Sequence, residues 1–292
     1  MSSCHICPRE CGVDRTRQAG FCGCSDVMHV SKTMLHRWEE PCISGTDKDR
    51  GSGAVFFSGC SLKCVFCQNK DISRTESGKT VTPAELGKIM LELQNEGAYN
   101  INFVSPTHYT TEIMKAIDSC RESLRVPTVW NTGGYEKPET VRMLAGYADI
   151  FLTDFKYASP EKAKIYASAS DYPEYALASL REMVKLAGKP KFDKNGMLES
   201  GVIVRHLVLP GERSGSIKLI SLLKDNFDKD DFLISVMRQY TPDFYSGEIK
   251  SLRRKVTSFE YKSVLDAVAD AGFDGYSQDA CSAAAAYTPD FR

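Results

Sequence analysis

Short apolar runs alternate with longer stretches of mixed polarity along the chain from residue 51 onward. Runs rich in β-branched and aromatic residues are typical of buried strands, whereas apolar positions three and four residues apart are typical of helices. The pattern predicts six strands, at residues 54–57, 101–104, 127–130, 149–155, 201–209 and 232–237. It predicts a helix that begins at residue 82 and further helices at residues 111–124, 138–147, 160–186 (in two pieces), 214–227 and 258–271.

The first of these helices has a clear start. Thr82 is a good N-cap, Pro83 fits the first helical position, and Glu85 stands where a capping box needs it. Ile89, Met90 and Leu93 then supply an apolar stripe at helical spacing, so the helix is expected to bury one side.

Strands that alternate with helices predict consecutive parallel βα units. With right-handed crossovers, six such units form either a partial barrel or a doubly wound sheet, and periodicity alone does not choose between the two. In both folds ligands bind at the carboxyl ends of the strands. The residues that follow these strands are polar, as loop residues often are, so each one alone is weak evidence of a site.

The first 50 residues differ from the rest of the chain. They are rich in Cys, Gly and Arg, contain few apolar runs, and are expected to be irregular. We therefore expect a Cys-rich N-terminal extension at residues 1–50 and an α/β core with a C-terminal helix and tail at residues 51–292. A chain of 292 residues that is 42% hydrophobic is long enough for a large core.

The charge balance narrows the choice of partners. The formal net charge is -1, which gives no reason to expect nucleic acid or an anionic membrane as a partner. No apolar run approaches the roughly 20 residues that span a bilayer. The first 15 residues contain no apolar segment typical of a secretion signal, so a cytoplasmic protein is expected.

Cysteine is the residue type that most changes this picture. Nine of the 11 cysteines lie at or before Cys67. In a cytoplasmic chain of this length thiols stay reduced, and clustered cysteines bind metal more often than they form disulfides. The crowding therefore predicts metal chemistry near the N-terminus.

Cys60, Cys64 and Cys67 have the spacing C-x3-C-x2-C and directly follow the first predicted strand. Three thiolates on one short loop can hold three irons of a 4Fe-4S cluster and leave the fourth iron open to a substrate or cofactor. The alternatives are weaker. Zinc usually takes four protein ligands, a disulfide would leave one thiol over, and buried core cysteines would not need this spacing.

This triplet, with an aromatic residue before its third cysteine, resembles the motif of the radical S-adenosylmethionine (SAM) superfamily. Residues 59–69, 154–156 and 204–211 further resemble the group related to pyruvate formate-lyase activating enzyme. The resemblance covers residues 53–240 and implies a partial (β/α)6 barrel. It implies that the open iron binds SAM, and that an electron from the cluster cleaves SAM to a 5′-deoxyadenosyl radical, which abstracts hydrogen.

The resemblance also implies a set of SAM-binding residues. Arg205 matches an arginine that pairs with the SAM carboxylate, a role that suits a guanidinium. Asn131 stands where the activating enzymes carry an aspartate, and Asp154 matches their later aspartate. An ion pair between Asp154 and Arg205 inside the barrel is the structural alternative. Phe66, the aromatic residue in the triplet, completes this part of the set.

One part of the family pattern is missing. The family often has Gly-Gly-Glu after the second strand, where the SAM amino group is held, and here that place reads Ser105-Pro106-Thr107. We expect Ser105, Thr107 or the backbone to take over this role. No residue is assigned to catalysis itself.

A second group of cysteines lies in the N-terminal extension. Cys4, Cys7, Cys11 and Cys22 together could form a four-cysteine site for zinc or a second Fe-S cluster. The segment has too few apolar residues for a core of its own, and a metal would supply the missing stability. The alternative is that reduced cysteines pack against the barrel.

The leading functional hypothesis is an anaerobic radical SAM oxidoreductase, similar to the glycyl-radical-activating enzymes, that modifies a protein. The resemblance implies reduced flavodoxin or ferredoxin as electron donor and a glycyl radical enzyme or another protein as substrate. Two alternatives remain open. One is a radical SAM enzyme that acts on a small molecule, and the other is a metal-binding scaffold or electron carrier without SAM chemistry.

Overall fold

Ten strands form one mostly parallel sheet in the computed structural model, which describes residues 3–279, 282 and 291. The strands are β1 (His29–His36), β2 (Gly51–Phe57), β3 (Lys79–Thr80), β4 (Ala98–Val104), β5 (Thr128–Thr132), β6 (Ile150–Asp154), β7 (Lys191–Phe192), β8 (Leu198–Leu207), β9 (Leu233–Met237) and β10 (Gly275–Ser277). All six predicted strands are present, as β2, β4, β5, β6, β8 and β9.

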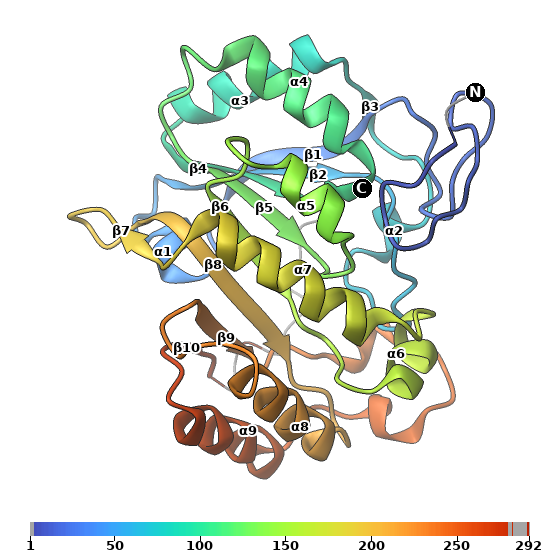
Figure 1. Ribbon diagram of the computed structural model, residues 1–292, viewed down its shortest axis with the longest axis vertical. Helices are drawn as coiled ribbons and strands as arrows, with labels where there is room; N and C mark the ends of the chain where they lie inside the picture. Colours follow the sequence, from blue (N-terminus) through green and yellow to red (C-terminus); the bar gives the residue numbers. More distant parts are fainter. Residues whose placement is uncertain (1–2, 280–281, 283–290, 292) are drawn as a thin grey trace.

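The longer helices lie along one side of the sheet, as Figure 1 shows. The helices are α1 (Pro41–Ser44), α2 (Lys70–Ser73), α3 (Pro83–Asn95), α4 (Thr110–Cys120), α5 (Pro138–Met143), α6 (Pro160–Ala167), α7 (Tyr172–Ala187), α8 (Arg213–Lys224) and α9 (Ser258–Ala271). The start predicted at Thr82 is confirmed, because Thr82 and Glu85 form both hydrogen bonds of a capping box. α4 and α5 end four residues earlier than predicted, where turns follow.

The order of the strands decides between the two predicted folds. The strands β2, β4, β5, β6, β8 and β9 are parallel and adjacent in that sequential order. A doubly wound sheet would reverse its strand order and carry helices on both faces. The chain therefore forms a partial (β/α)6 barrel with a Cys-rich, mostly irregular N-terminal extension.

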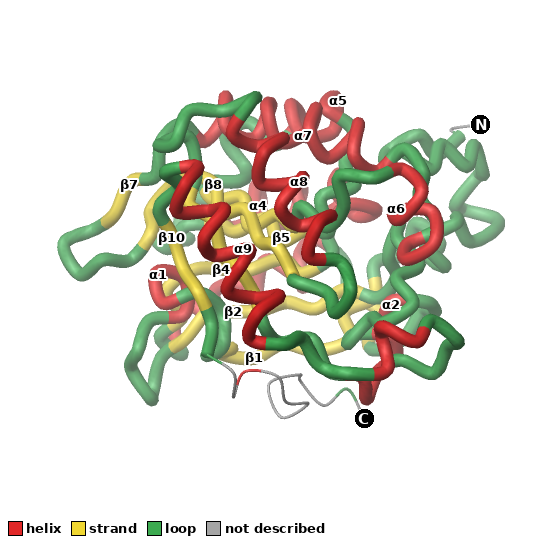
Figure 2. Tube along the Cα trace, turned by 90° about the horizontal axis from the view of Figure 1, so that it is seen from below, coloured by secondary structure: helices red, strands yellow, loops and turns green. Residues whose placement is uncertain are grey.

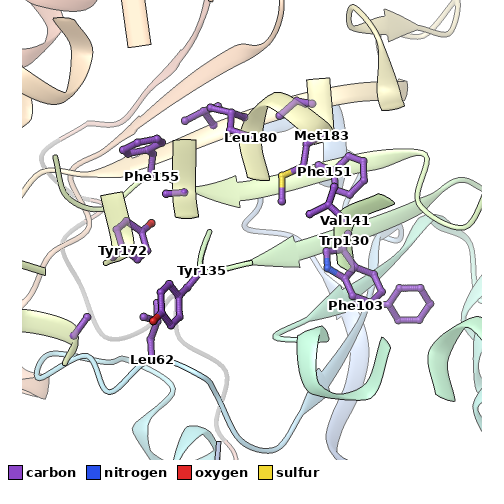
Figure 3. Close-up of a cluster of buried hydrophobic side chains, with 14 of the residues drawn as sticks. Leu62, Phe103, Trp130, Tyr135, Val141, Phe151, Phe155, Tyr172, Leu180 and Met183 are labelled. Carbon is purple, nitrogen blue, oxygen red and sulfur yellow. The ribbon is translucent and has the colours of Figure 1, made fainter. Parts of the chain in front are cut away.

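Large apolar side chains fill the space between the sheet and its helices (Figure 3). Phe103, Trp130 and Phe151 follow one another on three adjacent strands, and the first two rings meet edge to face at 6.3 Å. They face residues of α5 and α7, including Val141 and Met183. This outer core holds the strands in register, so that their carboxyl ends form one edge.

The inner side of the barrel has a separate, smaller core. Cys42 and Ile43 of α1 are buried against Val129, Ile150 and Ile203 from three neighbouring strands. The short helix thus plugs the barrel, and Ile43 O accepts a hydrogen bond from the Asn100 side chain at 2.7 Å. Above this plug the interior is polar.

The N-terminal 50 residues are less irregular than expected. Residues 29–36 form β1, which pairs antiparallel with β2 and so extends the sheet beyond the first barrel strand. Its sequence, HVSKTMLH, gives no clean alternation of apolar and polar residues, so the strand was not predicted. β1 covers the edge of β2, which would otherwise be exposed. Figure 2 shows α1 near the end of this strand.

Within the described residues, no helix is long and apolar enough to cross a bilayer.

Candidate active site

The three cysteines of the triplet lie in the loop that leaves the carboxyl end of β2. Gly59 opens this loop with φ +82°, where a Cβ would collide with a neighbouring side chain. Two backbone hydrogen bonds hold the loop against the end of α6, from Lys63 N–H to Ala167 O (3.1 Å) and from Val65 N–H to Tyr166 O (2.9 Å). The cysteines therefore stand at the carboxyl edge of the sheet, where the strand pattern predicted a ligand site.

Hydrogen-bonding groups lie near two of the three sulfur atoms of the triplet. Leu62 N–H points to Cys60 Sγ at 3.5 Å, and Cys67 Sγ lies 3.6 Å from Ser73 Oγ. Hydrogen bonds to sulfur tune the potential of an Fe-S cluster. Burial raises the pKa of Cys60 to about 11 and that of Cys64 to about 12, so metal binding must displace their protons.

Three thiols on one short loop suit an Fe-S cluster. Among the described residues, no group of three or more His, Cys, Asp or Glu side chains is arranged to hold a single metal ion. The thiolate ligands of a 4Fe-4S cluster each bind a different iron, so they stand farther apart than ligands of one ion. Three thiolates on one anchored loop thus fit a cluster with one iron left for another ligand.

The Phe66 side chain packs against aromatic residues beside the cysteine loop. It is 8% exposed, and its ring meets Tyr166 and Tyr240 edge to face at 6.3 and 5.7 Å. The residue was predicted to line the cofactor site, and the structure places it in the aromatic packing next to the cysteines.

Ser105 ends β4 in an unusual conformation. Its φ of +57° lies in the left-handed region that favours glycine, and its N–H donates to Asn131 O at 2.9 Å. A non-glycine residue in this region stores strain, and such strain is concentrated at functional sites. The backbone at Ser105 therefore takes a glycine-like turn at the place where the family often has Gly-Gly-Glu.

Thr107 reaches a buried glutamate that the sequence did not point to. The hydroxyls of Thr107 (2.5 Å) and Thr132 both donate to Glu136 Oε1. Glu136 is 1% exposed, and its Oε2 has no hydrogen-bond partner among the described residues. Burial raises the pKa of Glu136 to about 7, although the two hydroxyls act to lower it. A buried glutamate therefore lies four residues after β5 and contacts the segment where the family often has Gly-Gly-Glu.

Asp154 lies at the carboxyl end of β6, between two cations. Its Oδ2 is 2.5 Å from Lys156 Nζ, and its Oδ1 accepts from Arg205 Nε at 3.1 Å. Burial alone would raise the pKa of Asp154, but Lys156 and Arg205 hold it below its usual value. Lys156 also interacts electrostatically with the Cys64 thiol, so this lysine links the Asp154 pair to the cysteine loop.

Arg205 stands at the centre of a buried network inside the barrel. Besides Asp154, its guanidinium donates to Glu39 Oε2 at 3.0 Å and to Asn131 Oδ1 at 2.6 Å. Burial alone would lower the pKa of Arg205, but the carboxylates of Asp154, Glu39 and Glu40 raise it. The structure therefore brings together three of the six residues predicted for SAM, Asn131, Asp154 and Arg205, and it also contains the ion pair considered as the structural alternative.

Glu39 is the second residue that sequence reasoning missed. It lies between β1 and α1, and Oε1 of its side chain accepts from Asn102 at 3.2 Å and from Asn131 at 3.3 Å. Charged runs are usually on the surface, and Trp38 beside it is 60% exposed. Nothing in the sequence links Glu39 to Arg205, which is 166 positions away.

One member of the predicted second group of cysteines lies beside the triplet. Cys4, Cys7, Cys11 and Cys22 are all in the N-terminal segment, and Cys22 O accepts a hydrogen bond from Cys60 N–H at 3.2 Å. Cys42 is not part of this group, because it belongs to the α1 plug.

A cysteine loop after the first strand of a partial (β/α)6 barrel is the arrangement of a radical SAM enzyme. The family model of the Radical SAM superfamily matches residues 54–223, and the chain belongs to this superfamily. The family implies a 4Fe-4S cluster and SAM. The chain is also 30% identical over 278 residues to the uncharacterized protein MJ0674 of Methanocaldococcus jannaschii, a match that covers 91% of this chain and 74% of that one.

Solved structures agree on the fold. A radical SAM methyltransferase from Sphaerobacter thermophilus has a TM-score of 0.55 at 13% identity, over 80% of this chain and 69% of that chain. SuiB of Streptococcus suis, bound to S-adenosylmethionine, has a TM-score of 0.51 at 15% identity, over 75% of this chain and 48% of its own. The chain spans about half the length of SuiB, and at such identities the likeness concerns the fold alone.

Proposed function

We propose that this radical SAM enzyme cleaves SAM reductively and modifies a protein or peptide by hydrogen abstraction. The observation that carries the proposal is the anchored loop of Cys60, Cys64 and Cys67 at the carboxyl edge of a partial barrel. When bound there, a 4Fe-4S cluster supplies the electron that splits SAM into methionine and a 5′-deoxyadenosyl radical.

The residues around the loop would bind and orient SAM. Ser105 and Thr107 at the end of β4 would hold the amino group, with Glu136 fixing Thr107 in place. Arg205 would receive the carboxylate, and Asn131 and Asp154 orient its guanidinium. The apolar ring of Phe66 would support the cysteine loop from the side of Tyr240. No protein side chain is proposed as acid or base, because the radical formed from SAM abstracts the hydrogen.

A peptide substrate is favoured by one of the structural neighbours. SuiB has also been solved with its precursor peptide SuiA, at a TM-score of 0.52 to this chain. Within this class we propose activation of a glycyl radical enzyme, with reduced flavodoxin or ferredoxin as electron donor, on the resemblance of residues 59–69, 154–156 and 204–211 to the activating enzymes. A small-molecule substrate is the alternative.

The test is anaerobic reconstitution followed by strong reduction in the presence of SAM. We expect 5′-deoxyadenosine from the native protein and none from the Cys60→Ala, Cys64→Ala, Cys67→Ala variant. Cys120→Ala is the matched control, because Cys120 is buried in α4 away from the loop. A native protein that carries a full cluster and forms no 5′-deoxyadenosine would overturn the proposal.

The same assay assigns Arg205. Loss of a charge-assisted hydrogen bond costs about 1.5–3 kcal/mol, which is about ten- to a hundred-fold in affinity. We therefore expect Arg205→Ala to need that much more SAM while the cluster absorption stays unchanged. An unchanged SAM dependence would assign Arg205 to the structural network alone. A labelled product formed in cell extract would then show whether the substrate is a protein or a small molecule.

A further inference from the structure

The N-terminal segment folds back on itself so that its cysteines converge. Cys4 N–H donates to Val13 O at 2.9 Å, and Gly12 N–H donates back to Cys4 O at 3.1 Å. These two bonds bring the start of the segment beside Cys11. A turn closed by Glu10 N–H and Cys7 O (3.0 Å) lies between them. Two cysteines therefore stand at the base of this loop and one on its turn.

Cys22 joins this group from the other end of the segment. A Cβ built on Gly20 would lie 3.4 Å from both Cys11 Sγ and Cys22 Sγ, so the two sulfurs border the same small space. The Cys7 thiol in turn interacts electrostatically with Cys4 and Cys22. Four thiols from different turns of one segment thus face a common region.

Ordinary core packing does not explain this arrangement. Cys42 in α1 and Cys120 in α4 lie among apolar side chains of the core, as Cys22 and its neighbour Cys24 also do, but Cys4, Cys7 and Cys11 belong to no apolar cluster of the described residues. The segment from residue 3 to residue 28 has few apolar residues, and irregular segments of this kind gain stability from a bound metal. Cys7 and Cys22 are 7% and 6% exposed, whereas the other two of the four are partly exposed.

The group lies against the loop of the first cluster. Cys60 N–H donates to Cys22 O at 3.2 Å, and Arg9 Nε donates to Ser61 O at 2.7 Å. The Arg9 guanidinium also reaches the carbonyls of Ala167 and Ser168 at the end of α6, the same helix that holds the triplet loop. One scaffold therefore positions both sets of cysteines.

We propose that Cys4, Cys7, Cys11 and Cys22 hold a second iron–sulfur cluster beside the one on the triplet. The ligands are thiolates, which are typical of both zinc and Fe-S sites. The position of the group favours the cluster, because it lies against the triplet loop, where Cys60 N–H donates to Cys22 O at 3.2 Å, and each thiolate of a cluster binds its own iron. A site next to the triplet loop places the two clusters within range of magnetic interaction.

The test uses the full chain carrying Cys60→Ala, Cys64→Ala and Cys67→Ala, the triplet variant. It is reconstituted in the absence of air with iron and sulfide, and zinc is present at the same concentration as iron. We expect about four irons per chain in this variant, against about eight in the native protein. A Cys4→Ser, Cys7→Ser variant should also hold about four, and Cys120→Ala should match the native protein. Circular dichroism checks that each variant is folded.

The triplet variant keeps the proposed site intact, so a folding failure of the Cys4, Cys7 variant does not decide the outcome. Iron and sulfide absent from the folded triplet variant would overturn the proposal, and so would one zinc per chain in their place. The adjacency has its own readout. Electron paramagnetic resonance of the reduced native protein should show spin–spin broadening that is lost in the triplet variant and in the Cys4, Cys7 variant but kept in Cys120→Ala, whereas two independent spectra that simply add would contradict a neighbouring site.

Discussion

The core from residue 51 to residue 279 and the N-terminal part from residue 3 to residue 50 owe their order to different forces. In the core, apolar residues at strand and helix spacing bury two layers, one outside the sheet and one inside the barrel. Much of the N-terminal part instead docks through charged side chains. Arg9 and Arg15 donate to backbone carbonyls of the core, and Glu39 pairs with Arg205.

The difference matters for the site, because the two parts meet there. The core positions the triplet through β2 and α6, and the polar layer above the α1 plug is completed by Glu39 of the N-terminal part. A buried ion pair is a poor source of net stability but is costly to break. We therefore expect a single substitution at a contact between the two parts to lower stability strongly. A substitution at a local contact within the core should lower it less.

The largest effect is expected at Arg205. Arg205→Ala leaves Asp154 and Glu39 buried without the guanidinium, and removing one partner of a buried pair costs about 3–5 kcal/mol. Denaturant unfolding of the metal-free chain should show this loss. Lys262→Ala is the control, since Lys262 pairs with Asp266 at the surface, where such pairs contribute about 0–1 kcal/mol. Equal losses in the two variants would contradict a buried network that joins the two parts.

Glu136 gives the next largest effect, as a dependence on pH. Burial raises the pKa of Glu136 from 4.5 to about 7, so the folded state binds the proton more tightly than the unfolded state does. The resulting stability is fully present below pH 4.5 and is lost as the pH rises through about 7. The shift corresponds to about 3 kcal/mol.

Glu136→Gln has no titrating group at this position. Between pH 4.5 and pH 8, the native chain should therefore lose about 3 kcal/mol more stability than this variant does. Denaturant midpoints at the two pH values measure this difference. Glu161→Gln, at an exposed position of α6, should leave the native pH dependence unchanged. If both variants keep it, Glu136 has its ordinary acidity in the folded chain.

These residues show what the sequence could and could not predict. The period of the apolar residues predicted the six barrel strands, and the cysteine spacing predicted a cluster loop at the end of β2, because both depend on neighbouring positions. Glu39 and Glu136 were not predicted. Glu39 meets Arg205 only through the folding of 166 residues, and a glutamate in a polar loop gives no sign that it will be buried.

The sequence likewise could not decide between a partial barrel and a doubly wound sheet. Both folds share the same local alternation of strands and helices, and only the spatial order of the strands separates them. β1 was missed for a different reason. It lies near the edge of the sheet, with only the two-residue β3 beyond it, and a partly exposed strand in which Lys32 and Thr33 follow one another carries little periodic signal.

Arg9 tests the docking of the N-terminal segment with a smaller effect. Arg9→Ala removes the donors to three backbone carbonyls of the core, and hydrogen bonds to charged groups contribute about 1.5–3 kcal/mol. We expect residues 3–28 to exchange amide hydrogens faster, by about ten- to a hundred-fold, while β4 and β5 keep native protection. Exchange that rises equally in both regions would mean that the two parts unfold as one unit.

The smallest effect is expected at Thr82, where the contact is local to the core. Thr82 Oγ1 accepts a hydrogen bond from Glu85 N–H at 3.3 Å, a contact made within the core. Thr82→Ala removes the cap of α3 and should cost about 1 kcal/mol. The loss should appear in global unfolding, because α3 packs on α4 over the sheet. Exchange in residues 3–28 should stay as in the native chain, since Arg9 and its acceptors are untouched. Thr80→Ala, in an exposed strand residue two positions earlier, controls for loss of the threonine itself. If Thr82→Ala loosens the N-terminal segment as strongly as Arg9→Ala does, the segment depends on core stability and the distinction between the two parts fails.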